Sequence, residues 1–154
     1  QWMFKNAHTF NADLSQWDVS NVTNMSNMFS GATSLEGRGL SGWDVSKVVN
    51  MQWMFHNAHT FNADLSQWKV TKVTNMSYMF GGAKSFNANL SNWNVSGGTN
   101  TQHMFDGAVA FEAPMRSLPG GNGWTDESRE AHNAHWLPAV NPAKRARLGL
   151  PFKF

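Results

Sequence analysis

The sequence predicts a repeat solenoid of short parallel β-strands with helical, 3₁₀ or loop return segments, followed by an irregular C-terminal tail. The pair Met-Phe recurs at intervals of 25, 26, 25 and 25 residues, at positions 3–4, 28–29, 54–55, 79–80 and 104–105. In addition, residues 1–29 and 52–80 are identical at 24 of 29 positions, which indicates a duplicated pair of repeats. A unit of this length cannot bury its own apolar side, whereas stacked copies share one core.

Each predicted strand lies in a segment of the type Leu14-x-x-Trp17-x-Val19. This is the L-x-x-L-x-L spacing of leucine-rich repeats, so the fold is expected to be leucine-rich-repeat-like. Because side chains alternate along an extended chain, the three apolar residues should point inward and Asp18 outward.

The predicted return segment runs from Val22 to Ala32. Its apolar residues are three or four positions apart, which indicates a helical or 3₁₀ turn on the opposite wall. Asn recurs at one position of this segment in successive repeats, and we call such a set of equivalent positions a column. The Asn side chains are expected to satisfy backbone groups of the turns. This Asn column contains Asn24, Asn50, Asn75 and Asn100.

The repeated phrase LSxWDVSNVTNMSxMFxxAxxFN resembles the BspA-like leucine-rich-repeat surface proteins over residues 1 to about 115. The resemblance implies a parallel-stranded solenoid with a role in adhesion or protein–protein contact at a surface. It implies no catalytic residues. It also implies a cell-surface or extracellular location.

Composition excludes several classes of protein. The net charge of +2 is too small for a nucleic-acid-binding surface, and the absence of cysteine excludes disulfides and thiolate metal sites. No run of 18 apolar residues spans a membrane, although association with a membrane complex stays open. Because the chain starts in mid-repeat at Trp2-Met3-Phe4, we expect further chain upstream or a partner on that edge.

Two regions are expected: a solenoid of four repeats and a partial fifth over residues 1–115, and a non-repeat tail over 116–154. The tail carries four of the five prolines, and one short helix is expected near 126–136. Its apolar side chains are candidate anchors that cap the last repeat or dock on another protein. They are Trp124, Trp136, Leu148, Leu150, Phe152 and Phe154.

No catalytic, cofactor-binding or metal-binding set stands out from the repeating background. His8 and His59 recur only because the repeat recurs, and His132 and His135 lack an evident third metal ligand. Asp18 and Asp44 are stacked like charges that weakly suggest a cation, but an ion pair between Asp44 and Lys69 is favoured. No cofactor is therefore expected.

The candidate interaction surface consists of polar positions that face outward or differ between repeats: Asp18, Asp44, Lys69, Lys72, Asn94 and Tyr78. Tyr78 belongs to the column that precedes each Met-Phe pair. This column is the best contact stripe if it faces outward, but the core is the favoured place for it. Its members are Trp2, Asn27, Trp53, Tyr78 and His103.

Two functions are weighed, both non-enzymatic. The first is a BspA-like module for surface adhesion or recognition of a protein or glycan partner. The second is a structural subunit of a large multiprotein complex, for example in an organelle and associated with a membrane, anchored by the tail. No nucleic-acid partner is expected.

Overall fold

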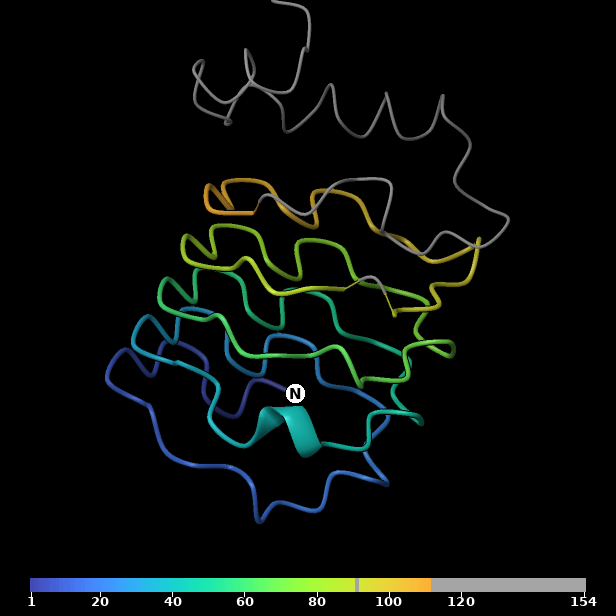
Figure 1. Cartoon of the computed structure of the whole chain (residues 1–154), viewed down its shortest axis with the longest axis horizontal. Helices are drawn as coiled ribbons and strands as arrows, with labels where there is room; N and C mark the ends of the chain where they lie inside the picture. Colours follow the sequence, from blue (N-terminus) through green and yellow to red (C-terminus); the bar gives the residue numbers. More distant parts are fainter. Residues whose placement is uncertain (91, 112–154) are drawn as a thin grey trace, which may run out of the picture.

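The computed structural model describes residues 1–90 and 92–111. Within them, the repeats lie one above another, with the first at the bottom of Figure 1 and the last at the top. Each repeat begins at the residue directly before a Met-Phe pair. Repeat 1 is 2–26, repeat 2 is 27–52, repeat 3 is 53–77, repeat 4 is 78–102, and repeat 5 begins at 103. Backbone hydrogen bonds join each repeat to the next, such as the 2.9 Å bond from the Phe29 N–H to the Met54 carbonyl.

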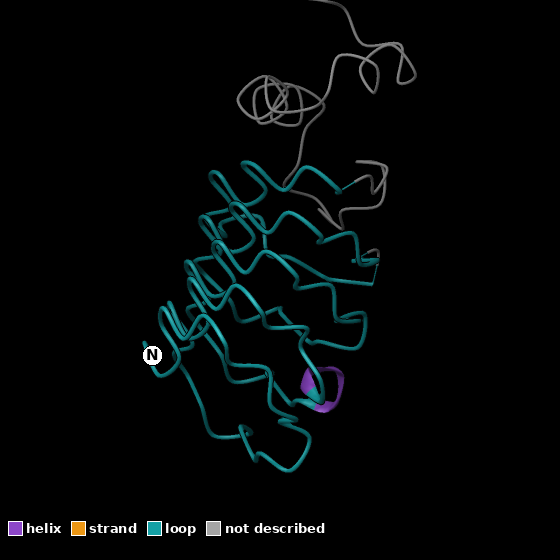
Figure 2. Ribbon diagram, turned by 90° about the vertical axis from the view of Figure 1, so that its left-hand side faces the viewer, coloured by secondary structure: helices purple, strands orange, loops and turns teal. Residues whose placement is uncertain are grey.

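The predicted leucine-rich-repeat-like solenoid of short parallel β-strands with helical, 3₁₀ or loop return segments is wrong. Figure 2 shows loops and turns throughout the described residues, with one short helical turn. This turn is the 3₁₀ helix η1 (Leu40–Gly42), and residues 1–90 and 92–111 contain neither an α-helix nor a named strand. Strand pairing is reduced to isolated parallel bridges within the Asn column, between Asn24 and Asn50, Asn50 and Asn75, and Asn75 and Asn100.

The return segment forms no helix because its N–H groups alternate between two kinds of partner. Every second N–H donates to the next repeat: Asn27 to Gln52, Phe29 to Met54 and Gly31 to His56. The N–H groups between them donate three residues back: Met28 to Met25, Ser30 to Asn27 and Ala32 to Phe29. Asn27 and Gly31 are also left-handed, with φ of 56° and 74°, and this conformation ends both helices and strands.

The predicted strand segment also consists of turns. The N–H of Trp17 donates to the Leu14 carbonyl at 3.1 Å, and the N–H of Val22 donates to the Val19 carbonyl at 2.8 Å. The Asp18 carboxylate accepts the Ser20 N–H at 3.0 Å. These local bonds use donors that a strand would offer to its neighbour.

Burial follows the predicted columns even though the strands are absent. Leu14 and Val19 are buried and Asp18 is exposed, as the spacing predicted, while Trp17 at the first repeat is 39% exposed. Phenylalanine rings stack through the core, with centroids 5.7 Å apart between Phe29 and Phe55. The Asn column caps turns as expected, because its side-chain oxygens accept N–H groups two residues on, as Asn50 does from Gln52 at 2.9 Å.

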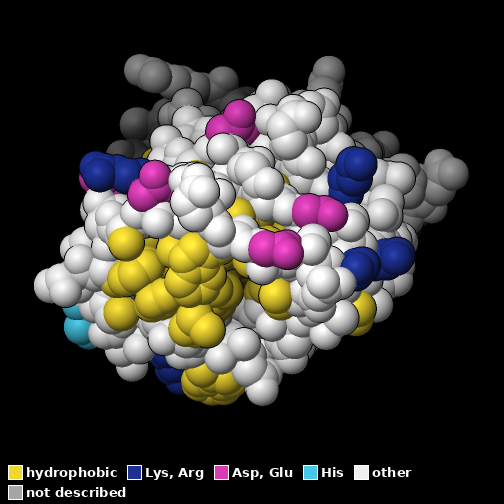
Figure 3. Space-filling model, turned by 90° about the horizontal axis from the view of Figure 1, so that it is seen from below, with side chains coloured by type: hydrophobic (Ala, Val, Ile, Leu, Met, Phe, Trp, Pro, Cys, Tyr) yellow, Lys and Arg dark blue, Asp and Glu magenta, His cyan; other side chains and the backbone are white. Residues whose placement is uncertain are grey.

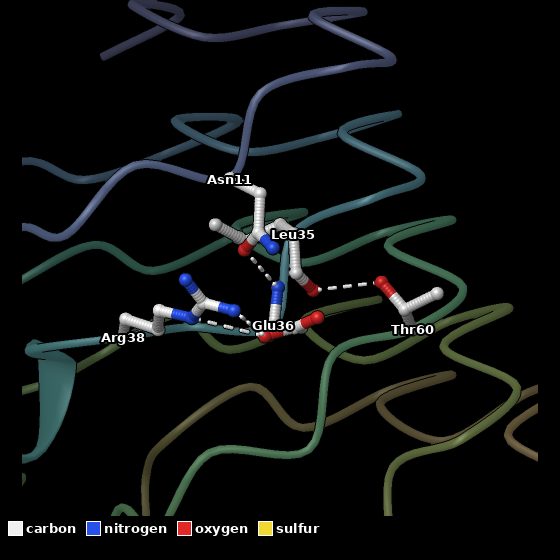
Figure 4. Close-up of polar contacts among 5 residues, drawn as sticks. All are labelled: Asn11, Leu35, Glu36, Arg38 and Thr60. Atoms are coloured by element: carbon white, nitrogen blue, oxygen red, sulfur yellow. Dashed lines mark hydrogen bonds and ion pairs between the residues drawn. The ribbon is translucent and has the colours of Figure 1, made fainter.

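The extra residue of repeat 2 is absorbed next to η1. Gly39, which precedes this helix, has φ of 82°, and a Cβ atom there would collide with the backbone of Ser15. Figure 4 shows the polar contacts beside it, where the Asn11 side chain accepts the Glu36 N–H at 2.9 Å. Arg38 forms an exposed ion pair with Glu36 at 2.9 Å in the same view.

Hydrophobic side chains gather on the end of the stack formed by repeat 1, which Figure 3 views from below. Exposed apolar residues of this repeat include Trp2, Met3 and Trp17. The predicted tail, 116–154, with its helix near 126–136, lies outside the described residues, so the two-region division stays a prediction.

Candidate functional site

Four of the predicted surface residues occupy equivalent positions of successive repeats. Asp18, Asp44, Lys69 and Asn94 are all exposed, as predicted. Hydrogen bonds from the Ser20 hydroxyl and N–H lower the pKa of Asp18. Hydrogen bonds from the Ser46 hydroxyl and N–H lower the pKa of Asp44, and the positive charges of Lys69 and Lys47 lower it further.

Lys69 and Asp44 interact only at longer range. No ion pair joins them within the described part of the chain, so the direct pair expected from the sequence is not formed. Lys72 is exposed as well, but it belongs to the neighbouring column, in which Lys47 donates to the Asn21 side chain at 2.6 Å. The resulting surface is polar and of mixed charge.

Tyr78 lies elsewhere, in what we call the aromatic column: Trp2, Asn27, Trp53, Tyr78 and His103, one from each repeat. These side chains are exposed or half-buried and lie outside the hydrophobic core, so the favoured core placement is wrong. The Tyr78 ring stacks on Trp53 at 4.4 Å and on His103 at 4.6 Å, with interplanar angles of 22° and 14°.

All five residues of the aromatic column have a left-handed backbone, with φ between 56° and 65°. Asn adopts this conformation readily, but it is uncommon for bulky residues such as Trp and Tyr. A second left-handed column lies four residues later in each repeat. It contains only Asn and Gly, the residue types that adopt this conformation most readily. Its members are Asn6, Gly31, Asn57, Gly82 and Gly107.

A recess of about 530 Å³ interrupts the aromatic column at repeat 2. Its central residues are small, namely Asn27, Ser30 and Gly31. The repeats on either side place large residues at the equivalent positions, with Trp2 and Lys5 in repeat 1 and Trp53 and His56 in repeat 3. The recess therefore results from a difference in side-chain size between neighbouring repeats.

Unused amide groups surround the recess. The side chains of Asn6, Asn27, Asn57 and Gln52 all line it, and none of them makes a side-chain hydrogen bond with another described residue. Each carboxamide offers two donor hydrogens and an acceptor oxygen. The site can therefore form several hydrogen bonds with a polyhydroxylated or amide-bearing ligand.

Charged and titratable groups flank these amides. The Lys5 ammonium lies 3.9 Å from the ring centre of Trp2 in a cation–π contact. His56 packs on Trp53 with ring centroids 4.3 Å apart, and burial lowers the pKa of His56. His56 is therefore kept neutral near pH 7 and can both donate and accept a hydrogen bond.

The remaining titratable groups offer little chemistry. His103 contacts Asp106 through Nδ1 and Oδ2 at 2.7 Å. Among residues 1–90 and 92–111, no group of three His, Asp or Glu side chains is close enough to hold a metal ion. The six candidate tail anchors, from Trp124 to Phe154, lie outside the described residues.

Sequence reasoning named the aromatic column but missed the recess. The unrecognised residues were Lys5, Asn6, Ser30, Gly31, Gln52, His56 and Asn57. One signal was present, because Asn27 is the single residue without a ring in a column that otherwise reads Trp, Trp, Tyr and His. The absence of a ring at Asn27 predicts a recess only if the column is known to face outward.

The repeats match a known family. The profile of the family described as "Mycoplasma protein of unknown function, DUF285" covers residues 1–118. The chain belongs to this family. DUF285 corresponds in general to the BspA-like repeat proteins, so the resemblance seen in the sequence is confirmed at the level of the family. The specific 25-residue motif stays a prediction.

No curated protein and no solved structure matches this DUF285 member. In the part of the chain that the structure describes, no helix is long and apolar enough to cross a membrane.

Proposed function

We propose that this DUF285 chain is a non-enzymatic recognition module of the BspA-like type, which binds a macromolecular partner at a surface in adhesion or recognition. The partner is a protein or a glycan. The observation that carries the proposal is the aromatic column, which holds stacked rings outside the core on left-handed backbone.

The energetics of the aromatic column support a role other than folding. A left-handed backbone costs roughly 1–2 kcal/mol for a residue with a side chain such as Tyr. A stacked aromatic pair contributes roughly 0.5–1.5 kcal/mol. Trp53, Tyr78 and His103 make two stacked pairs but carry three left-handed backbones, so stacking does not exceed the backbone cost along the column. Asn27 occupies the same conformation without a ring. Trp53 and Tyr78 therefore add little net stability but provide a ridge of rings suited to contact.

The mixed polar column that contains Asp18, Asp44 and Lys69 is the weaker candidate. Asp18 and Asp44 already use their carboxylates in local hydrogen bonds, and exposed charges give little binding energy in salt solution. Aromatic residues are enriched where binding energy is concentrated. We therefore place the main contact on Trp53 and Tyr78 and assign a supporting role to Lys69 and Lys72.

An array experiment tests the proposal. The 154-residue chain and its Trp53→Ala/Tyr78→Ala double variant are applied to arrays of cell-surface glycans and extracellular protein fragments. We expect a ligand that the wild type binds and that the double variant loses by at least about tenfold. A Val49→Ala variant, which shortens an exposed apolar side chain outside the aromatic column, serves as the surface control and should bind as the wild type does.

Two results would count against the proposal. A wild type that binds nothing on either array removes the recognition role. Equal binding by the double variant removes the aromatic column as its site. If deletion of 116–154 abolishes binding while the double variant retains it, the structural-subunit reading with a tail anchor is favoured instead.

A further inference from the structure

The recess is the place of a missing ring. Trp53, Tyr78 and His103 stack at 4.4 and 4.6 Å, so one repeat step equals one stacking distance. Trp2 and Trp53 are two steps apart, which corresponds to roughly 9–10 Å at the usual spacing of neighbouring extended chains. Asn27 stands between them without a ring. One six-membered ring from a ligand therefore fits between the two indoles.

We propose that this recess binds one pyranose ring of a glycan between Trp2 and Trp53. The inference rests on the proposed recognition function and names its ligand class. The two broad sides of a pyranose carry C–H groups, whose partial positive charge is attracted to the negative face of an aromatic ring. The indoles of Trp2 and Trp53 line the recess at a separation that one sugar ring can fill, and a sugar that stacks on the Trp2 face covered by the Lys5 ammonium displaces that ammonium.

The polar lining favours a sugar over an aromatic side chain of a protein. Asn27 and Gln52 are half-buried in the recess, and Asn6 and Asn57 lie more exposed around it, all with unused carboxamides. A phenyl ring inserted here would remove these groups from water without pairing them, which is unfavourable. Sugar hydroxyls both donate and accept, so they pair with the amides and with neutral His56.

The charges of the residues that line the recess restrict the kind of sugar that it accepts. Lys5 is the one permanently charged residue among those that line the recess, and no carboxylate is among them. The Lys5 ammonium can donate to a hydroxyl or pair with a carboxylate of an acidic sugar. Neutral and acidic pyranoses therefore both suit the recess, and an amino sugar with a free ammonium group does not.

The test uses the 154-residue chain on an array of immobilised neutral and acidic oligosaccharides, followed by calorimetric titration of the strongest binder. Asn27→Tyr supplies the missing ring, and the backbone at this position already accommodates Tyr78 in repeat 4. We expect the affinity of Asn27→Tyr to fall at least about tenfold because the added ring fills the recess.

Two further variants keep the test independent of how Asn27→Tyr folds. Asn57→Gly removes one carboxamide, and glycine occupies the equivalent position in repeats 2, 4 and 5, so the fold should persist. We expect it to weaken binding severalfold, by roughly three- to tenfold. Ser34→Tyr adds the same ring to an exposed position of repeat 2 outside the recess and should leave the affinity unchanged.

The sugar proposal is overturned if no oligosaccharide binds the wild type, or if Asn27→Tyr and Asn57→Gly both bind as tightly as the wild type. Failure of the recognition function itself looks different. If a protein fragment binds the wild type but not Trp53→Ala/Tyr78→Ala, and no sugar binds, the recognition function stands and only the pyranose site is overturned.

Discussion

The indole Nε1–H of Trp68 donates a hydrogen bond of 2.9 Å to the carbonyl of Leu40, one repeat earlier in the chain. Trp43 and Trp93 make the equivalent bonds to Leu14 and Leu65, at 3.1 and 2.8 Å. These three tryptophans thus link repeats 2, 3 and 4 to the preceding repeat by packing and by a buried hydrogen bond.

Replacement of Trp68 by Phe should reduce the free energy of unfolding. The Leu40 carbonyl keeps the N–H of Trp43 as a donor, at 3.2 Å, so the lost indole bond costs roughly 0.5–1.5 kcal/mol, and the smaller ring adds a cavity term. The matched control is Trp17→Phe, because Trp17 is 39% exposed and makes no such bond with a described residue. Urea unfolding followed by circular dichroism measures both, and equal losses would contradict the role given to the hydrogen bond.

Replacement of Tyr78 by Asn should reduce stability by less than about 2 kcal/mol, because relief of left-handed strain offsets most of its two stacking contacts, with Trp53 and His103. Its neighbour Met79 is fully buried, and Met79→Ala should cost roughly 2–5 kcal/mol. Thermal and urea unfolding of the two variants give the comparison. A loss in Tyr78→Asn as large as that in Met79→Ala would show that the aromatic column serves folding.

Two glycines beside the insertion should respond differently to alanine. Gly39 has φ of 82°, and a Cβ atom there meets the Ser15 backbone, so Gly39→Ala should destabilise by at least about 2 kcal/mol. Gly42 has open space around its missing Cβ, and Gly42→Ala should be neutral or slightly stabilising. The midpoint of urea unfolding distinguishes them, and similar midpoints would exclude a tight turn at Gly39.

Acidification should destabilise the repeats through His56. Burial lowers the pKa of His56 below its ordinary value of 6.5, so the unfolded chain binds a proton more readily than the folded chain. Stability should therefore fall as the pH drops below about 6.5 and level off below the folded pKa. Melting temperatures between pH 8 and 5 test this, and His56→Gln should show a smaller decline. An identical decline in both proteins would assign the effect to other groups.

The sequence allowed the repeat, its register and most inward positions to be predicted, because apolar columns such as those of Leu14 and Val19 follow from burial alone. The strands and helical returns were wrong for a local reason. Left-handed residues at Asn27 and Gly31 redirect alternate N–H groups to the next repeat, and such angles are hard to foresee at Trp53 or Tyr78. The same angles turn the aromatic column outward. Because this orientation was not predicted, the recess within the column was not predicted either.

The most direct test of recognition by the aromatic column is an NMR titration of the 154-residue chain, ¹⁵N-labelled at the tryptophan indoles, with the strongest ligand from the arrays. We expect the Nε1–H signals of Trp2 and Trp53 to shift on binding. Those of Trp68 and Trp93, which are buried and hydrogen-bonded within the stack, should stay in place. Shifts confined to Trp124 and Trp136 of the tail, with Trp53 unmoved, would contradict it.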